Sequence, residues 1–183
     1  MHTPPDNLLF VTGNAGKLRE ARAFLPIPVE GEAMHLPELQ TMDAAELLRH
    51  KCLEAFARVG RPLFVEDTFL VFHAWGRLPG PYIKDFLGEL GLEGLVRALE
   101  PFGDASAEAI CHIAYHDGSG VHHFSGSVAG QVTHPRGEHG FGWDALFQPT
   151  GSPRTYGEMP LEEKQQHSMR ARALQAFADF LAG

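Results

Sequence analysis

Two adjacent acidic residues, Glu66 and Asp67, combine side-chain chemistry with an unusual position in the chain. They follow the apolar, β-branched and aromatic run Leu63–Val65, which predicts a buried strand that ends at the two carboxylates. A buried anion without compensation is neutralised, paired or bound to a cation. The pair therefore indicates either a divalent metal or a basic partner close by, or a simple turn of both acids into solvent; this stretch alone favours neither interpretation.

The segment Thr12–Lys17 is the second candidate for chemistry. The run Leu8–Val11 predicts a short strand, and apolar residues after Lys17 recur at helical spacing. Free N–H groups at a helix start, two glycines and a lysine suit an anion such as phosphate. The segment is not a Walker A loop, because Leu18 stands where that motif has Ser or Thr. The alternative is an ordinary strand-to-helix turn with a polar cap.

A lysine on an apolar helix face is the third candidate. Asp43 and Glu46 predict a capping pair that opens a helix with an apolar stripe, and Lys51 falls on that stripe. Its ammonium group either extends past the edge of the core or reaches inward to an anion. Glu38 comes shortly before this helix, on a connection that Pro37 constrains.

Two later loops are rich in glycine. In the first, Gly76–Pro81 is expected to hold Tyr82 and Lys84 in fixed positions. The second, Pro135–Asp144, is called the glycine-rich loop below and contains Phe-Gly-Trp at 141–143. Two aromatic rings separated by one glycine can present flat faces to a planar ligand, while Gly142 leaves room for its edge. The alternative is an aromatic pair that caps the core.

The remaining pattern predicts a mixed α/β chain. Asp-Gly at 117–118 lies between apolar runs and predicts a hairpin, so this half of the sheet is expected to be antiparallel. The other expected elements are an edge strand within Pro26–Glu32, a strand at Phe69–Phe72, helices from Ile83 to Leu99 interrupted at Gly91, strands at Ala109–Tyr115, Val121–Phe124 and Val128–Val132, a short strand at Ala145–Phe147, and a terminal helix that starts at Pro160.

Composition narrows the function classes. The 183 residues, 44% of them hydrophobic, suit a single domain over residues 1–183, with two lobes. A formal net charge of −8 argues against a nucleic-acid partner or an anionic-membrane partner. No apolar run has the length of a membrane span, and Met1–Asn7 lacks the features of a signal peptide, so a cytoplasmic protein is expected. The 2 cysteines and 11 histidines do not have zinc-site spacing.

In combination and in order, these features resemble the inosine triphosphate pyrophosphatase family, which hydrolyses nonstandard purine nucleoside triphosphates. The resemblance runs from Thr12 to about Leu174. It is carried by Thr12-Gly13-Asn14 with Lys17, Leu36-Pro37-Glu38, Glu66-Asp67-Thr68 through Leu78–Lys84, Phe141-Gly142-Trp143-Asp144, and Glu158-Met159 through Glu163-Lys164 to Ser168 and Arg170. It implies an α/β fold with a long twisted mixed sheet flanked by helices, two lobes around a central substrate cleft, and a homodimer.

The resemblance also implies a role for each matched residue. The implied catalytic residues are Asp67, Lys51 and Glu66: Asp67 would act as general base, and Glu66 would orient water or a second metal. Glu38 and Asp67 would hold Mg²⁺. The residues implied to bind the triphosphate are Thr12, Gly13, Asn14, Lys17 and Lys51. Those implied to meet the rest of the substrate are Thr68, Lys84, Phe141, Gly142, Trp143, Asp144, Lys164, Met169 and Arg170, with Phe141 and Trp143 stacked on the purine.

The implied reaction is hydrolysis of ITP, dITP or XTP to the monophosphate and pyrophosphate, which clears deaminated purines from nucleotide pools. Water attacks the α-phosphorus, and catalysis is mainly positioning and charge neutralisation. Donors such as Lys164 and Arg170 would meet the 6-oxo group of hypoxanthine or xanthine. Adenine would leave these donors unpaired, at a cost of about 1–3 kcal/mol per group.

Three positions depart from the family pattern. Met169 stands where the family has a base-contacting histidine, Gln165 replaces an asparagine, and Gly157 replaces an alanine with no consequence evident from the pattern. We therefore expect hydrolysis to be retained with weaker or shifted base discrimination. The alternatives are a family member that prefers another base, and a nucleotide-binding module with little turnover. The intact acidic residues and Lys51 speak against the second alternative, because a pure binder does not need a metal-water apparatus.

Overall fold

A computed structural model describes residues 5–183 of the chain. Residues 1–4, part of the segment used above to argue against a signal peptide, lie outside the described residues. The chain divides into two compact units. The first unit comprises the residues up to Asp67, Cys111–Gly126 and Arg170–Gly183, and the second comprises Thr68–Ile110 and Ser127–Met169.

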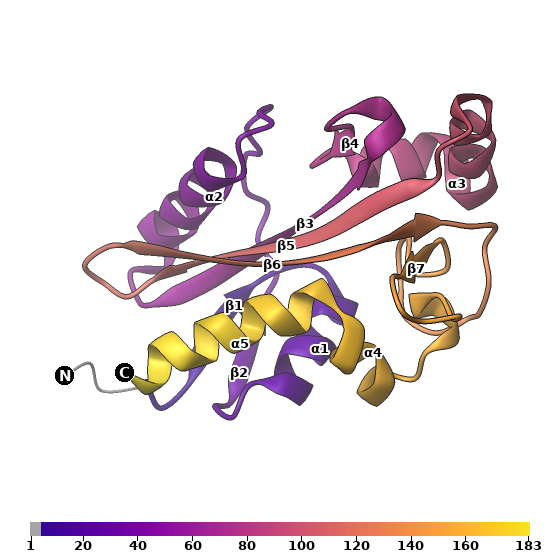
Figure 1. Cartoon of the computed structure of the whole chain (residues 1–183). Coiled ribbons are helices and arrows are strands. Elements are labelled where there is room, and N and C mark those ends of the chain that lie inside the picture. The colour runs from indigo at the N-terminus through magenta and orange to yellow at the C-terminus, as the bar shows by residue number, and fades with distance from the viewer. Residues whose placement is uncertain (1–4) are drawn as a thin grey trace. The chain divides into compact units, whose positions relative to one another are not determined.

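The described residues form an α/β fold around a seven-stranded mixed sheet (Figure 1). The strand order is β2-β1-β3-β5-β6-β7, with β4 paired to β3; β1 is parallel to β2 and β3, whereas β4 is antiparallel to β3 and β7 to β6. The elements in chain order are β1 (Leu8–Val11), α1 (Ala15–Phe24), β2 (Val29–Glu32), α2 (Ala44–Val59), β3 (Leu63–Phe72), η1 (His73–Trp75), β4 (Pro79–Gly80), α3 (Ile83–Leu99), η2 (Glu100–Phe102), β5 (Ser106–His116), β6 (Val121–Val132), β7 (Phe147–Pro149), η3 (Tyr156–Glu158), α4 (Leu161–His167) and α5 (Met169–Ala182).

Aromatic packing fixes the layers of the first unit. Phe64 of β3 stacks on Phe10 of β1, with ring centroids 4.3 Å apart, and meets Phe177 of α5 at 5.2 Å. Phe56 of α2 stacks on His116 of β5 at 3.6 Å. Helix α2 lies on one side of these strands, and α1 and α5 lie on the other (Figure 1). Residues that alternate along β3 therefore face different helices.

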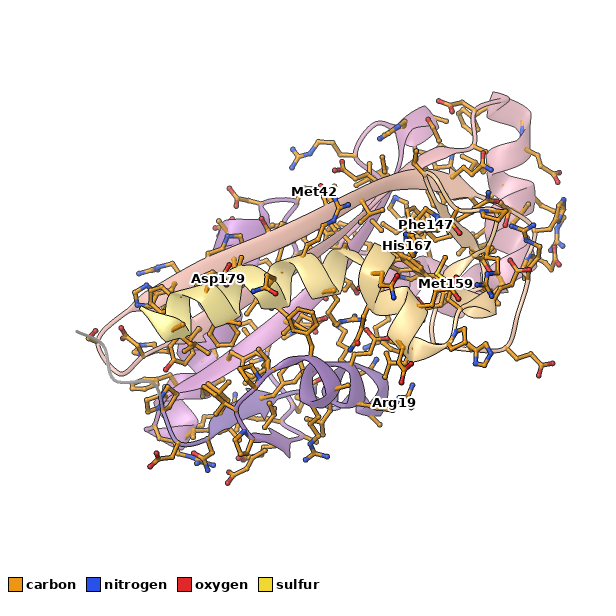
Figure 2. The ribbon with its side chains drawn as sticks, turned by 60° about the horizontal axis from the view of Figure 1, so that its bottom comes forward. Arg19, Met42, Phe147, Met159, His167 and Asp179 are labelled. Carbon is orange, nitrogen blue, oxygen red and sulfur yellow. The ribbon has the colours of Figure 1, made fainter. Side chains whose placement is uncertain are left out.

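The second unit has its own aromatic core. Trp143, Phe147 and Tyr156 are buried and contact one another through their rings. Met159 is buried as well; Phe147 and Met159 are labelled in Figure 2. At the other end of this unit, α3 bends at Gly91, whose φ of 66° is left-handed, as the sequence pattern predicted.

Several local predictions are wrong. The strands expected at Val121–Phe124 and Val128–Val132 are one continuous strand, β6, and the strand expected at Ala145–Phe147 begins only at Phe147, as β7. Strand β3 does not end at Glu66 and Asp67 but continues to Phe72, because both carboxylates find cationic partners without leaving the strand. The terminal helix is two helices, since Ser168 has extended backbone between α4 and α5. The predicted start of α2 is confirmed, because Asp43 caps the helix by accepting from Glu46 N–H; only the reciprocal bond is missing, since the carboxylate of Glu46 accepts from Thr41.

The helices of residues 5–183 are all too short or too polar to cross a membrane.

Candidate functional site

The two carboxylates at the centre of β3 face opposite sides of the sheet. Successive side chains of a strand alternate, and the contacts follow that rule: Glu66 pairs with Arg170 of α5, and Asp67 pairs with Lys51 of α2. Their exposure differs in the same way. The side chain of Glu66 is 0% exposed, whereas that of Asp67 is 22% exposed and is accessible to a ligand.

Two lysines from different helices converge on Asp67. Nζ of Lys51 lies 3.8 Å from Oδ2 of Asp67 and 3.5 Å from Oε1 of Glu38. Nζ of Lys17 lies 3.9 Å from Oδ1 of Asp67 and 3.4 Å from Oε1 of Glu66. Lys51 thus reaches an anion, which was one of the two interpretations of a lysine on an apolar stripe. The structure brings together the residues predicted to hold phosphate, metal and water in the first unit.

The turn before α1 is organised by its own polar side chains. Asn14 caps α1 by accepting a hydrogen bond from the backbone N–H of Lys17 at 3.0 Å, and Oγ1 of Thr12 accepts one from Asn14 N–H. A Cβ placed on Gly13 would meet no described atom within 4 Å. This turn starts a helix of ten residues whose dipole favours an anion at this end.

Behind the lysines lies a buried ion network that the sequence analysis did not predict. Arg170 donates from Nε to Oε1 and Oε2 of Glu66 at 3.1 and 3.0 Å and pairs with Glu20 through Nη1. Burial alone would raise the pKa of Glu66, yet the charges of Arg170 and Lys17 hold it below its usual range. Glu20 comes three residues after Lys17 on α1, and that helical spacing was the available signal.

The carboxylate oxygens around Lys51 are of the type that magnesium binds. Carboxylates of Glu38 and Asp67 approach one ammonium group, and Mg²⁺ prefers two carboxylates together with phosphate oxygens and water. Within residues 5–183, no group of three or more His, Cys, Asp or Glu side chains is arranged to hold a metal by itself. Glu38 and Asp67 are the residues that would hold a magnesium ion here.

In the second unit, an ion pair between Lys164 and Asp144 of the glycine-rich loop lies next to the ring of Phe141. Lys164 of α4 is 2% exposed and donates from Nζ to Oδ2 of Asp144 at 2.7 Å. The same oxygen accepts the backbone N–H of Phe141 at 2.8 Å. Nζ of Lys164 also lies 5.1 Å from the centroid of the Phe141 ring. Phe141, Asp144 and Lys164 therefore form one connected group.

The other predicted substrate contacts differ in accessibility. Trp143 is 7% exposed and packs on Phe147 and Tyr156, which matches the core-capping interpretation of this ring. Lys84 is exposed in the first turn of α3, and Thr68 is half-buried in β3. Met169 is 1% exposed at the start of α5. The contacts of Arg170 given above are all with carboxylates of the first unit, and its role at the base remains a prediction.

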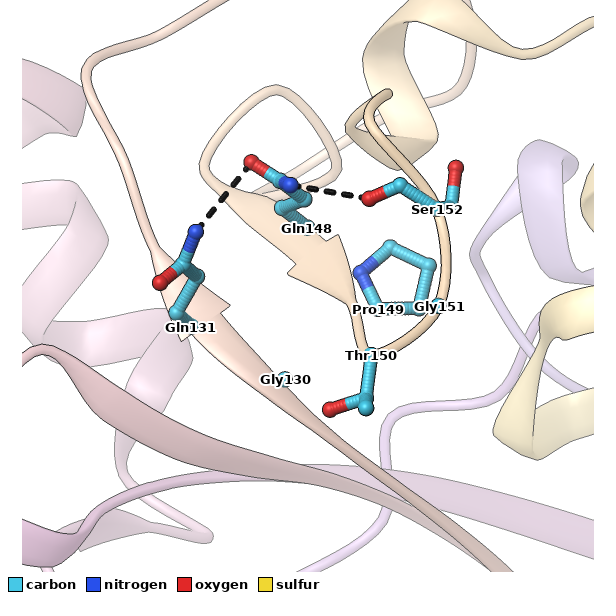
Figure 3. Close-up of a pocket in the computed structure, with 7 residues that line it drawn as sticks. All are labelled: Gly130, Gln131, Gln148, Pro149, Thr150, Gly151 and Ser152. Atoms are coloured by element: carbon cyan, nitrogen blue, oxygen red, sulfur yellow. Dashed lines mark hydrogen bonds between the residues drawn. The ribbon is translucent and has the colours of Figure 1, made fainter.

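A hollow of about 250 Å³ in the second unit is lined by none of these groups (Figure 3). It is lined by Gly130, Gln131, Gln148, Pro149, Thr150, Gly151 and Ser152. Its lining includes no charged or aromatic side chain, so it lacks the groups that bind a triphosphate or stack on a base.

Comparison with known proteins identifies the family. A model described as the Ham1 family matches residues 8–180. The chain belongs to the Ham1 family. A curated inosine triphosphate pyrophosphatase of Candida glabrata is 42% identical over 188 residues, which cover 97% of this chain and 98% of that protein. The family resemblance inferred from the motifs is thus confirmed.

Solved Ham1 structures share the fold. The Ham1 protein of Staphylococcus aureus superimposes with a TM-score of 0.83 over 97% of this chain and 98% of its own. A HAM1 protein of Coxiella burnetii gives 0.82 over 96% and 98%. Both are 24% identical to this chain and bear on the fold alone. The predicted α/β class with a mixed sheet flanked by helices is confirmed, while the division of one domain into two lobes around a cleft remains a prediction.

Proposed function

We propose that this Ham1-family protein hydrolyses deaminated purine nucleoside triphosphates, namely ITP, dITP and XTP, to the monophosphate and pyrophosphate. The observation that carries the proposal is the convergence of Lys17 and Lys51 on Asp67, next to the capped start of α1. Two ammonium groups, a helix N-terminus and accessible carboxylates suit a polyphosphate and an attacking water. The 42% identical inosine triphosphate pyrophosphatase supports the same reaction.

Each candidate site residue of the first unit has a role in this proposal. Lys17, Lys51 and the turn Thr12–Asn14 bind the phosphates and neutralise charge that builds up on their oxygens. Asp67 accepts the proton of the attacking water, and Glu38 and Asp67 hold Mg²⁺. When bound, Mg²⁺ neutralises phosphate charge and lowers the pKa of water. Glu66 is fully buried and holds Lys17 in place, so we assign it to positioning.

The second unit supplies the base-binding groups of the proposal. Phe141 offers a partly exposed ring face, Gly142 leaves space beside it, and Lys164 offers a donor suited to a 6-oxo group. Asp144 holds that donor in place through its 2.7 Å contact. Adenine has an amino group at position 6 and cannot satisfy the same donor.

The test is a substrate panel with the purified protein. Pyrophosphate release is measured with ITP, dITP, XTP, GTP, ATP and the pyrimidine nucleotide CTP, with magnesium and after chelation. We expect ITP and XTP to exceed ATP in kcat/KM by at least about 100-fold, and chelation to abolish release. A larger kcat/KM for a pyrimidine or canonical nucleotide would establish the alternative of a shifted base preference, and binding of ITP without turnover would establish the binding-module alternative.

A homodimer is part of the proposal. Exposed apolar side chains of the second unit, Leu78, Leu90 and Phe102, are 42%, 43% and 58% exposed. Trp75 lies between α3 and η2, in ring contact with Phe86 and Phe102. Helix α3 carries basic residues (Lys84, Arg97) as well as glutamates, and a surface with both signs of charge is self-complementary across a two-fold axis. We expect light scattering to give twice the chain mass, and Phe102→Glu to give the monomer. A cytoplasmic location remains a prediction.

A further inference from the structure

The glycine-rich loop is held by a short turn that follows it in the chain. This clamping turn, Thr155–Met159, contains η3 and is closed by a capping box between Thr155 and Glu158. Because the box satisfies the turn internally, the turn is a rigid support. The loop and the turn both belong to the second unit.

Backbone hydrogen bonds join the loop to the turn on both sides of Gly157. Gly157 N–H donates to the carbonyl of Asp144 at 2.9 Å, and its carbonyl accepts from His139 N–H at 2.8 Å. Oγ1 of Thr155 donates to the carbonyl of Arg136 at 2.8 Å. The turn thus contacts the beginning, middle and end of the loop.

Gly157 sits where the two arms of the loop close. Arg136 N–H donates to the carbonyl of Ala145 at 3.0 Å, so the arms are joined directly over the turn. A Cβ on Gly157 would lie 2.5 Å from the carbonyl oxygen of Arg136 and 2.7 Å from Cα of Ala145. Both atoms are backbone, so no side-chain rotation relieves the clash, and the loop itself would have to move.

A shift of the loop at Ala145 would also displace the neighbouring residue Asp144, which belongs to the proposed base-binding group. Asp144 precedes Ala145, and its Oδ2 accepts both Lys164 Nζ and Phe141 N–H. Any displacement of Ala145 therefore moves the carboxylate that holds Lys164 and Phe141 together. The packing is reciprocal, because a Cβ on Gly137 would lie 2.0 Å from the carbonyl oxygen of Gly157.

We infer that Gly157 is a positioning residue for base recognition in this chain: where the family pattern has alanine, its missing Cβ lets the glycine-rich loop close more tightly on the clamping turn and sets the positions of Asp144, Lys164 and Phe141. This inference rests on the proposed function. It predicts that a single methyl group at position 157 changes discrimination between bases, while the phosphate chemistry of Lys17, Lys51 and Asp67 is kept.

The experiment compares wild type, Gly157→Ala and a control, Gly88→Ala. Gly88 lies on α3 in the same unit, and a Cβ there would meet no described atom within 4 Å. In Gly157→Ala we expect the KM for ITP to rise about tenfold, kcat to stay within about twofold, and the ratio of kcat/KM for ITP over GTP to change at least about fivefold. The control should match wild type.

Amide hydrogen exchange provides a readout that does not depend on turnover. Exchange in residues 136–144 should be about tenfold faster in Gly157→Ala than in wild type or the control. Unchanged loop exchange, an unchanged ITP/GTP ratio, or a fall in kcat alone and equally for all bases would each overturn the inference. If wild type hydrolyses no nucleotide, the proposed function fails, while the exchange result still decides whether Gly157 holds the loop.

A second variant covers the case in which Gly157→Ala does not fold. Thr155→Val removes the hydrogen bond to the carbonyl of Arg136 without adding volume. We expect the same direction of change in KM, base ratio and loop exchange, and wild-type values in all three would overturn the inference.

Discussion

Arg170 and Glu66 form a buried ion pair in which Nε of the arginine lies 3.1 and 3.0 Å from the two carboxylate oxygens. The guanidinium group of Arg170 also forms an ion pair with Glu20 through Nη1. The pKa of Arg170 stays well above its usual value, although burial opposes it, because two carboxylates favour the charged form. The pair lies directly behind Lys17, so the lysine that we propose to bind phosphate is held by a structure that the solvent does not reach.

Removal of Arg170 should therefore destabilise the protein strongly. Arg170→Met leaves two buried carboxylates without their shared cation, and we expect a loss of about 3–5 kcal/mol in the free energy of unfolding, measured by urea titration. Arg19→Met is the control, because Arg19 is exposed on α1 (Figure 2) and should change stability by less than about 0.5 kcal/mol. A loss below about 1 kcal/mol for Arg170→Met would show that the network contributes little.

Asp67→Asn tests the proposed general base. The amide keeps the size of the side chain but cannot accept the proton of water, so we expect kcat for ITP to fall about 100- to 10,000-fold. Binding of ITP, measured by calorimetry, should change far less, because Lys17 and Lys51 remain. Retention of more than about a tenth of wild-type kcat would mean that Asp67 is not the base.

Met169→His tests the departure from the family pattern. Met169 is 1% exposed, so a histidine there must either displace its neighbours or turn toward the base as a new donor. We expect the ratio of kcat/KM for ITP and XTP over GTP and ATP to rise about tenfold, with kcat for ITP nearly unchanged. Unchanged selectivity in this variant would remove the link between Met169 and base discrimination.

His112 should make the protein sensitive to mild acid. Burial, and next the neighbouring His123, lower the pKa of His112 to about 4 from 6.5, against the opposing charge of Asp67. Between these values the unfolded chain binds a proton that the folded chain does not, so stability falls as the pH falls. The urea midpoint should therefore drop between pH 7 and pH 5, and drop less in His112→Phe. His35→Gln, at an exposed site, should behave as wild type. Equal pH dependence in all three proteins would contradict this assignment.

Local rules predicted the elements where pattern and packing agree. The strand Leu8–Val11, the helix after Lys17 and the break at Gly91 all follow from periodicity and glycine. The end of β3 was mispredicted at Glu66 because a propensity rule treats adjacent acids as a strand terminus. Arg170 and Lys17 neutralise Glu66 from distant parts of the chain, and local sequence does not contain those contacts.

The sequence predicted which residues form the candidate site, but not the residues that hold them in position. Lys51 lies beside both Asp67 and Glu38, a grouping that the family resemblance implied and that the residues alone left open. Glu20 escaped notice, and Gly157 was noticed as a departure from the family pattern but given no consequence, because neither residue carries unusual chemistry by itself. Glu20 matters through a partner 150 positions away, and Gly157 matters through the Cβ that it lacks. Clashes between backbone atoms depend on tertiary distances, which cannot be read from a single sequence.

Glu66 and Asp67 are adjacent in one continuous strand, so the side of the sheet that each carboxylate faces depends on the register of β3. Glu66 faces α5 and Asp67 faces α2 only because the strand alternates. One residue inserted between Leu63 and Glu66 would shift Glu66 into the place of Asp67, beside Lys51, and the residue before Glu66 would then face Arg170 instead. We therefore expect β3 to reject single insertions there even when the added residue is apolar, whereas the hairpin at 117–120 should accept them.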